Sequence, residues 1–338
     1  MSAATLGDKR MVSLLLDRTG VPSDFEYPNH GGETILFAAS GNGHVAVASF
    51  LLERGADVDL CRTDDGMIPL FAAVQGGHSK VVEELLAHGA NVNLAISFFG
   101  HTPLYVASQE GHVDIVEMLL GKGAGVNQTT DDGLTALYIA SWQGHAKVVE
   151  ELLAHGANIH LASSYYGQPL YVASQEGHVD IVETLLGKGA DVNEPTTEDG
   201  ATALYIASRQ GHAKVVEKLL AHGANVNLAI SFFGHTPLYV ASQEGHVDIV
   251  EMLLGKGAGV NQTTDDGLTA LYIASWQGHA KVVEELLAHG ANIHLASSYY
   301  GQPLYVASQE GHVDIVETLL GKGADVNEPT TEDGATAL

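Results

Sequence analysis

Apolar and polar residues along this chain form two short helical patterns that recur together. The first begins at Thr102-Pro103-Leu104, where the threonine can cap free amides and proline suits the first helical position. This pattern predicts a helix that runs to about Glu110. A second helix is predicted after His112, because its apolar residues share one face while polar residues face water. The apolar face of this second helix consists of Ile115, Val116, Leu119 and Leu120.

The helix pair repeats along almost the whole chain. A Gly-His dipeptide marks each copy, and its nine histidines lie 34, 34, 33, 33, 34, 34, 33 and 33 residues apart. Gly111 and Gly123, at the ends of the two predicted helices, can adopt the positive φ that ends a helix. A fixed period of this length is typical of a solenoid, in which each helix pair buries its apolar face against its neighbours.

Several motifs resemble the ankyrin-repeat family. They are Thr102-Pro103-Leu104, Gly111-His112, Val148-Val149, Leu152-Leu153, Gly156-Ala157 and Val192-Asn193. The resemblance implies an all-α fold, an ankyrin-type α-solenoid of stacked helix-turn-helix repeats with β-hairpin fingers. Two departures stand out. An aromatic residue replaces the histidine that usually follows Thr-Pro-Leu in this family, and Gln168 and Gln302 replace the capping threonine.

The repeats predict one elongated domain with unequal ends. We expect a degenerate N-terminal repeat over residues 1–27, nine ankyrin-type repeats over residues 28–330, and the start of a truncated tenth repeat over residues 331–338. This arrangement suggests a fragment of a longer array. Residues 85–204 recur without a single change at 219–338. Such identity indicates recent duplication, gene conversion or deliberate construction, which the sequence does not separate.

The chain is strongly acidic, with 41 Asp and Glu against 15 Lys and Arg and a formal charge of −26. This balance argues against binding to nucleic acid, which needs cations against phosphates. It fits a partner with a basic surface, or a chain that is simply well solvated. The single Cys61 fits a reducing compartment. With no apolar run long enough for a membrane span, we expect a cytoplasmic or nuclear protein.

Several residue groups could in principle carry chemistry, but each has a structural role that explains it. The group of His112, Asp114 and Glu117 recurs four times, but these side chains are not expected to converge as metal ligands must. Gly121-Lys122-Gly123 follows a helix and lacks the Ser or Thr of a phosphate loop. We therefore expect no metal, no cofactor, no small-molecule substrate and no enzymatic activity. An enzyme domain outside these residues stays open.

The finger tips and the first helices supply the candidate partner-binding residues. Some finger tips carry paired aromatic residues, which protein interfaces use as anchors, although one ring of each pair could instead pack on the neighbouring finger. These residues are Phe98, Phe99, Tyr165, Tyr166, Phe232, Phe233, Tyr299 and Tyr300. Residues just before Gly-His face the concave groove that the family resemblance implies, and in that family these positions contact partners. They include Gln109, Glu110, Trp142, Gln143, Gln175, Glu176, Arg209 and Trp276.

One further pattern concerns modification. Leu185 with Asp191-Val192-Asn193 resembles the pattern that asparaginyl hydroxylases modify on ankyrin repeats, and the same residues recur around Asn327. The alternative is that each asparagine only hydrogen-bonds its turn.

These observations predict a protein-protein interaction scaffold that binds its partner through the concave groove and the finger tips. Trp142, Trp276 and the aromatic tips would anchor the partner. The alternative function is a structural or spacer repeat array, natural or engineered, without a dedicated ligand.

Overall fold

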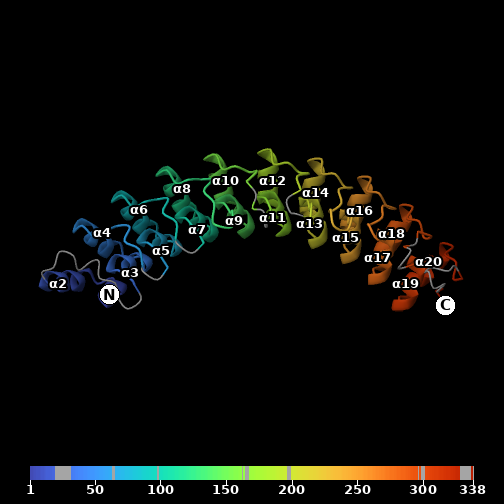
Figure 1. The fold of residues 1–338 in the computed structure, drawn as a ribbon, viewed down its shortest axis with the longest axis horizontal. Coiled ribbons are helices and arrows are strands. Elements are labelled where there is room, and N and C mark those ends of the chain that lie inside the picture. Colours follow the sequence, from blue (N-terminus) through green and yellow to red (C-terminus); the bar gives the residue numbers. More distant parts are fainter. Residues whose placement is uncertain are drawn as a thin grey trace. The chain divides into compact units, whose positions relative to one another are not determined.

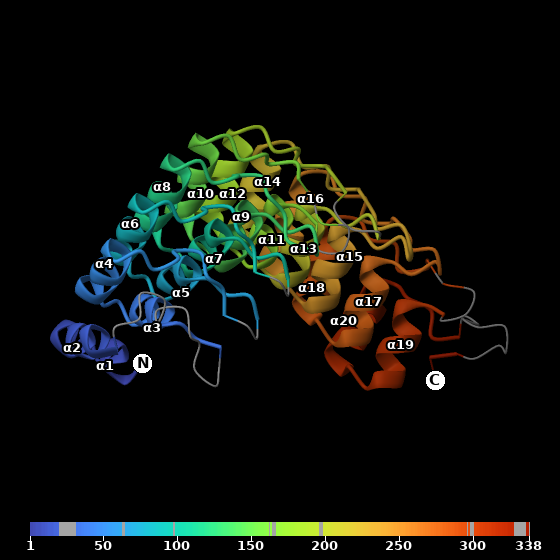
Figure 2. The same cartoon turned by 60° about the vertical axis from the view of Figure 1, so that its left-hand side comes forward.

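The computed structural model describes residues 1–19, 32–62, 65–96, 99–161, 163, 167–195, 199–295, 297, 301–327 and 336–337. The chain divides into two compact units, Met1–Ser163 and Ser164–Leu338. Figure 1 shows the helices in order along the chain, and Figure 2 turns the same ribbon by 60°. Each unit is built from pairs of short helices, as the sequence predicts.

The first unit contains ten helices in its described residues. They are α1 (Ser2–Thr5), α2 (Lys9–Thr19), α3 (Ile35–Gly41), α4 (Val45–Glu53), α5 (Pro69–Gln75), α6 (Ser79–Ala87), α7 (Pro103–Glu110), α8 (Val113–Gly121), α9 (Ala136–Gln143) and α10 (Ala146–Ala154). The odd-numbered helices pack on one another in sequence, and so do the even-numbered helices. We call these two stacks the first-helix row and the second-helix row.

The second unit also contains ten helices in its described residues and has the same two rows. Its helices are α11 (Pro169–Gln175), α12 (Val179–Gly187), α13 (Ala203–Gln210), α14 (Ala213–Ala221), α15 (Pro237–Glu244), α16 (Val247–Gly255), α17 (Ala270–Gln277), α18 (Ala280–Ala288), α19 (Pro303–Glu310) and α20 (Val313–Gly321). Both helices of each pair are also in contact with each other, for example α13 with α14.

The local sequence determines where the helices begin and end. The Thr102 side chain accepts a hydrogen bond from the Tyr105 amide at 3.1 Å, so it caps α7 as expected. Gly111 ends this helix in the left-handed region, with φ 74°. Gln168 takes nearly the same backbone angles as the capping threonines, but its side chain makes no capping bond to α11.

The core lies between the rows and consists of small and branched apolar residues. Ile115, Val116 and Leu119 of α8 are fully buried, which confirms the predicted apolar face. Most aromatic residues that follow the helix-capping position are buried as well, including Tyr105 and Tyr138. Tyr171 is only partly buried and packs against a cluster in the second unit that contains Tyr205 and Tyr239.

Histidines of the Gly-His motif connect successive repeats. His145 Nε2 lies 2.9 Å from the Gln109 carbonyl of the preceding repeat, and His279 Nε2 lies 2.9 Å from the Gln243 carbonyl. A carbonyl only accepts hydrogen bonds, so Nε2 carries the hydrogen in these contacts. These bonds hold the C-terminal ends of α7 and α15, the part of a first helix where the candidate groove residues lie.

In the described residues the fingers between repeats contain turns and no strands, in contrast to the expected β-hairpins. Backbone bonds lead across these turns, for example from the Ile96 amide to the His101 carbonyl at 3.0 Å and from the Thr130 amide to the Leu134 carbonyl at 2.9 Å. The described residues form no strand, and the pairing of Ser297 with Gly301 is an isolated bridge. The segments are too short for a ladder of several backbone bonds.

Candidate functional site

Trp142 and Trp276 occupy the C-terminal ends of α9 and α17 in the first-helix rows. Each is 39% exposed. Each indole meets the ring of a buried tyrosine edge-on, at 6.1 Å between Trp142 and Tyr138 and at 6.2 Å between Trp276 and Tyr272. This contact restricts the indole while leaving part of its surface to solvent, an arrangement that suits an interface anchor.

The finger aromatics that the structure describes are exposed. Phe99 is 60% exposed, Phe232 is 62% and Phe233 is 56%. Phe233 contacts the ring of His235 at 5.5 Å, and His235 stacks on Tyr239 at 4.4 Å, so an exposed finger ring is connected to a buried first-helix ring. The remaining predicted tip residues lie outside the described residues. They are Phe98, Tyr165, Tyr166, Tyr299 and Tyr300.

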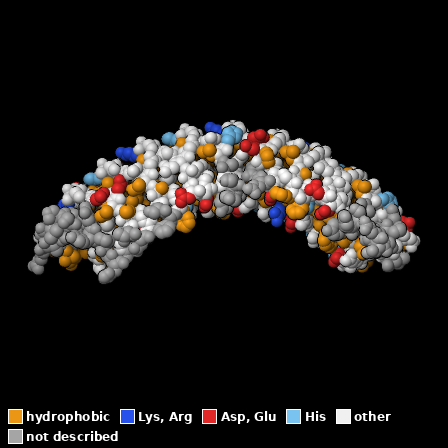
Figure 3. Space-filling view, viewed as in Figure 1, with side chains coloured by type: hydrophobic (Ala, Val, Ile, Leu, Met, Phe, Trp, Pro, Cys, Tyr) orange, Lys and Arg blue, Asp and Glu red, His pale blue; other side chains and the backbone are white. Residues whose placement is uncertain are grey.

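The other predicted groove residues lie at the ends of the first helices, with different degrees of exposure. Gln109 and Gln175 are partly buried. The exposed members are Glu110, Gln143, Glu176 and Arg209. On the face drawn in Figure 3, basic side chains are few and acidic side chains are more frequent, in keeping with the net charge of −26.

A pocket of about 310 Å³ brings some of these residues together in the second unit. Arg209 of α13 and Gln243 of α15 line it, together with Phe233 of the adjoining finger. Sequence reasoning proposed Arg209 and Phe233 separately and missed the other walls, which include Tyr171, Tyr205, His235 and Asp199. The signal that could have found the pocket is the positive charge of Arg209, because the other described first helices of α3 to α19 contain no lysine or arginine.

Burial changes the acid-base properties of the pocket walls. Removal from water raises the pKa of Tyr171 and of Tyr205, and the charge of Arg209 partly offsets this rise. Removal from water also lowers the pKa of His235, against the opposing effect of Asp265 and Asp266. The pocket therefore holds neutral phenol groups at neutral pH, next to one fixed cation.

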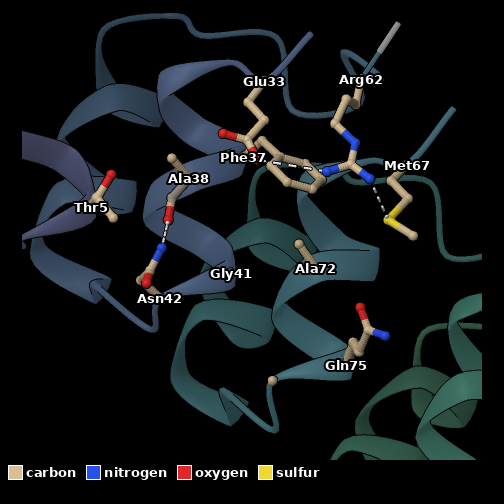
Figure 4. Close-up of a pocket in the computed structure, with 11 residues that line it drawn as sticks. Thr5, Glu33, Phe37, Ala38, Gly41, Asn42, Arg62, Met67, Ala72 and Gln75 are labelled. Atoms are coloured by element: carbon tan, nitrogen blue, oxygen red, sulfur yellow. Dashed lines mark hydrogen bonds and ion pairs between the residues drawn. The ribbon is translucent and has the colours of Figure 1, made fainter. Parts of the chain in front are cut away.

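A second pocket, of about 460 Å³, lies in the first unit and has a different charge arrangement. Figure 4 shows Arg62 near the Phe37 ring, with Glu33 and Met67 close by. The Arg62 guanidinium lies 5.2 Å from the Phe37 ring centre and 3.6 Å from a Glu33 oxygen. Arg62 Nε also donates to Asp65 Oδ1 at 2.9 Å. Two carboxylates thus compensate this cation.

Other candidate chemistry finds little support in the described part of the chain. No group of three or more His, Cys, Asp or Glu side chains there could hold a metal ion. Cys61 is exposed and carries a free thiol. Among the described helices, none is long and apolar enough to cross a membrane.

Asn193 is held by the next repeat. Its Nδ2 donates to the Gly223 carbonyl at 3.3 Å, and its Oδ1 accepts from the Asn225 amide at 2.7 Å. Both ends of the amide are therefore engaged, by the next repeat and not by the turn that contains Asn193. The Asn327 side chain is exposed, and its own backbone amide donates to Asp325 Oδ1 at 2.9 Å. Hydroxylation at either residue stays a prediction.

Comparison with known proteins agrees with this geometry. A family model of three ankyrin repeats matches residues 56–130, 84–163, 122–196, 170–264 and 253–330, and a model of one ankyrin repeat matches residues 31–63. The chain belongs to the ankyrin repeat family, so the resemblance seen in the sequence is confirmed.

A solved structure shows the same fold. The chain is similar to the crystal structure of the human ASB11 ankyrin repeat domain, with 30% sequence identity and a TM-score of 0.61. The similarity covers 67% of this chain and 99% of that domain. A search of curated protein sequences returned no match. Ankyrin repeats are generally protein-interaction modules, which defines the functional class of this chain.

Proposed function

We propose that this chain is a scaffold that binds a partner protein through its first-helix rows and the adjoining fingers. The observation that supports this proposal best is the pair Trp142 and Trp276. Each indole is partly exposed at the end of a first helix and rests on a buried tyrosine. A rigid, partly exposed tryptophan loses little conformational freedom on binding, which is why such residues dominate interface energetics.

The exposed phenylalanines extend the same surface. Phe99, Phe232 and Phe233 provide apolar area on the fingers. The carboxylates at Glu110 and Glu176 face solvent beside the first helices. We therefore propose a partner segment with apolar anchor residues and a net positive charge, because such a segment complements both features. This proposal assigns no catalytic role and no nucleic-acid contact to the chain.

The experiment selects linear peptides from a random display library on the 338-residue chain and measures their affinities by calorimetry. Trp142→Ala with Trp276→Ala should weaken binding by about thirtyfold or more, since loss of one hot-spot residue costs about 2 kcal/mol or more. The matched control is Met118→Ala with Met252→Ala, at duplicated positions on the second-helix rows. If no peptide binds the chain, or if the control weakens binding as much, the scaffold proposal fails in favour of a spacer.

A further inference from the structure

Arg209 is unlike every other residue of the first-helix rows. It is the only lysine or arginine in the described odd-numbered helices α3 to α19. Its side chain is exposed and lines the pocket in the second unit. Its guanidinium forms no ion pair and no hydrogen bond with the described part of the chain. The backbone at this residue is fixed, because His246 Nε2 lies 3.2 Å from the Arg209 carbonyl.

The surroundings of Arg62 in the first unit differ from those of Arg209. Arg62 also lines a pocket, but Glu33 and Asp65 lie against its guanidinium. The Arg209 pocket contains one carboxylate among its lining residues, Asp199, and no ion pair joins the two. Arg209 therefore keeps five hydrogen-bond donors in a fork that matches a carboxylate.

The pocket walls favour an anion with a single charge. Tyr171 and Tyr205 line the pocket and carry protonated phenol groups that can donate hydrogen bonds. Asp199 at the same pocket, and Glu244 on α15, would repel a second negative charge. One arginine with these neighbours fits a carboxylate better than a phosphate dianion. A volume of about 310 Å³ accommodates one side chain with part of its backbone.

The repeated sequence gives this cation a particular role. The helices α7 and α15 have the same sequence, and so do α9 and α17. A partner segment that recognised only these helices would find equivalent sites in more than one register. The position equivalent to Arg209 one duplication earlier, at 209 − 134 = 75, is Gln75. A single arginine without an ion-pair partner makes one of these binding registers different from the others, so it can select that register.

We propose that the Arg209 pocket receives one Asp or Glu side chain of the partner segment and thereby fixes the register of that segment on the second unit. This inference rests on the proposed scaffold function and specifies it: the segment that is otherwise apolar and basic carries one acidic residue. That residue forms a charge-assisted hydrogen bond with Arg209 in the pocket that Tyr171 and Tyr205 also line.

The test selects peptides on the wild-type chain and counter-selects on Arg209→Gln, which installs the residue found at position 75. Peptides that survive should share an Asp or Glu. Changing that residue to Asn or Gln should weaken binding to the wild-type chain by about tenfold to a hundredfold, as expected for hydrogen bonds between charged groups. The same change should have no effect on Arg209→Gln.

Two further variants make the result specific. Lys218→Gln removes the same charge from the second-helix row, where Lys218 pairs with Glu183 at 2.9 Å, and it should leave binding unchanged. Arg209→Glu should restore affinity for a peptide in which Lys replaces the acidic residue. If the peptides bind the wild-type chain and Arg209→Gln equally well, the inference about Arg209 is overturned. If the same peptides fail to bind the Trp142→Ala, Trp276→Ala chain, the scaffold function is still supported. Failure of all peptides to bind would overturn both.

Discussion

The residue that precedes each first helix controls how well that helix begins. Thr135 takes φ −103° and ψ 165°, and its hydroxyl accepts from the Tyr138 amide at 3.1 Å. Gln168 takes φ −103° and ψ 163° without a capping bond. Because the backbone geometry is nearly the same, a threonine side chain fits the capping role at position 168.

Gln168→Thr should therefore stabilise the chain by about 1 kcal/mol, the usual contribution of a capping side chain. The reciprocal change, Thr135→Gln, should destabilise it by a similar amount. Urea unfolding followed by circular dichroism would compare the midpoints of both variants with that of the wild-type chain. A lower midpoint for Gln168→Thr would contradict this prediction.

His101 and His235 give the chain a dependence on pH. Burial lowers the pKa of both side chains, while neighbouring aspartates act in the opposite direction. In the unfolded chain a histidine has a pKa of about 6.5. As the pH falls, these two histidines therefore bind a proton in the unfolded chain at a higher pH than in the folded chain. Protons then favour the unfolded state, and stability decreases below about pH 6.5.

Replacing both residues by phenylalanine should reduce this decrease, because the aromatic stacks with Tyr105 and Tyr239 can persist while the proton site is lost. Thermal unfolding midpoints between about pH 7.5 and pH 5.5 would measure the effect. The exposed His88 at the end of α6 provides the control as His88→Gln. An unchanged pH profile in the double variant would argue against this role.

At the scale of the helix pair, two glycines with similar backbone angles have different surroundings. Gly111 has φ 74°, and a Cβ there would lie 2.6 Å from His145 Nδ1 of the next repeat. Gly123 has φ 88°, and a Cβ there would meet nothing within 4 Å. The first glycine therefore serves both the helix end and the contact between repeats, and the second serves the helix end alone.

Gly123→Ala should cost about 1 kcal/mol from the left-handed backbone. Gly111→Ala should cost clearly more, because the new methyl group displaces the imidazole that bonds to Gln109. Urea midpoints of the two variants would give the difference. Equal costs would mean that the histidine moves aside without loss.

Helices and caps could be predicted from the sequence because they depend on neighbours within a few residues, as at Thr102, Gly111 and Ile115. The exposure of Trp142 and Phe99 was also predictable, since no apolar neighbour in the repeat pattern covers them. The pocket at Arg209 was not, because its walls come from successive first helices and two fingers. The family resemblance implied β-hairpin fingers, but the described finger residues form turns without strands.

At the scale of the whole molecule, identical segments occupy different surroundings. Leu186 of α12 is 8% exposed, whereas its copy Leu320 of α20 is 41% exposed. Burial of a leucine contributes about 1.5–3 kcal/mol, and local stability limits hydrogen exchange. We therefore expect α20 to exchange faster than α12 in the 338-residue chain.

Because the two helices have one sequence, a peptide covering residues 179–186 has the same mass as its copy at 313–320. Exchange followed by mass spectrometry should thus show two isotope envelopes for this peptide, one fast and one slow. The control peptide, from residues 113–120 and its copy at 247–254, should show one envelope, since Leu120 and Leu254 are each 8% exposed. A single envelope for both peptides would refute the expectation.

The exact duplication also determines how such an array can change in length. The residues 205–218 separate the two copies, so a recombination event between them would add or remove a block of 134 residues. The contact between α13 and α15 joins this separating segment to the second copy, and each added block would reuse it without a new interface. Arg209 lies within that block, so every insertion would also carry one more copy of the arginine for which we propose an acidic ligand. The number of these arginines would then equal the number of segments that separate successive copies. A longer array would therefore gain partner-binding sites one block at a time.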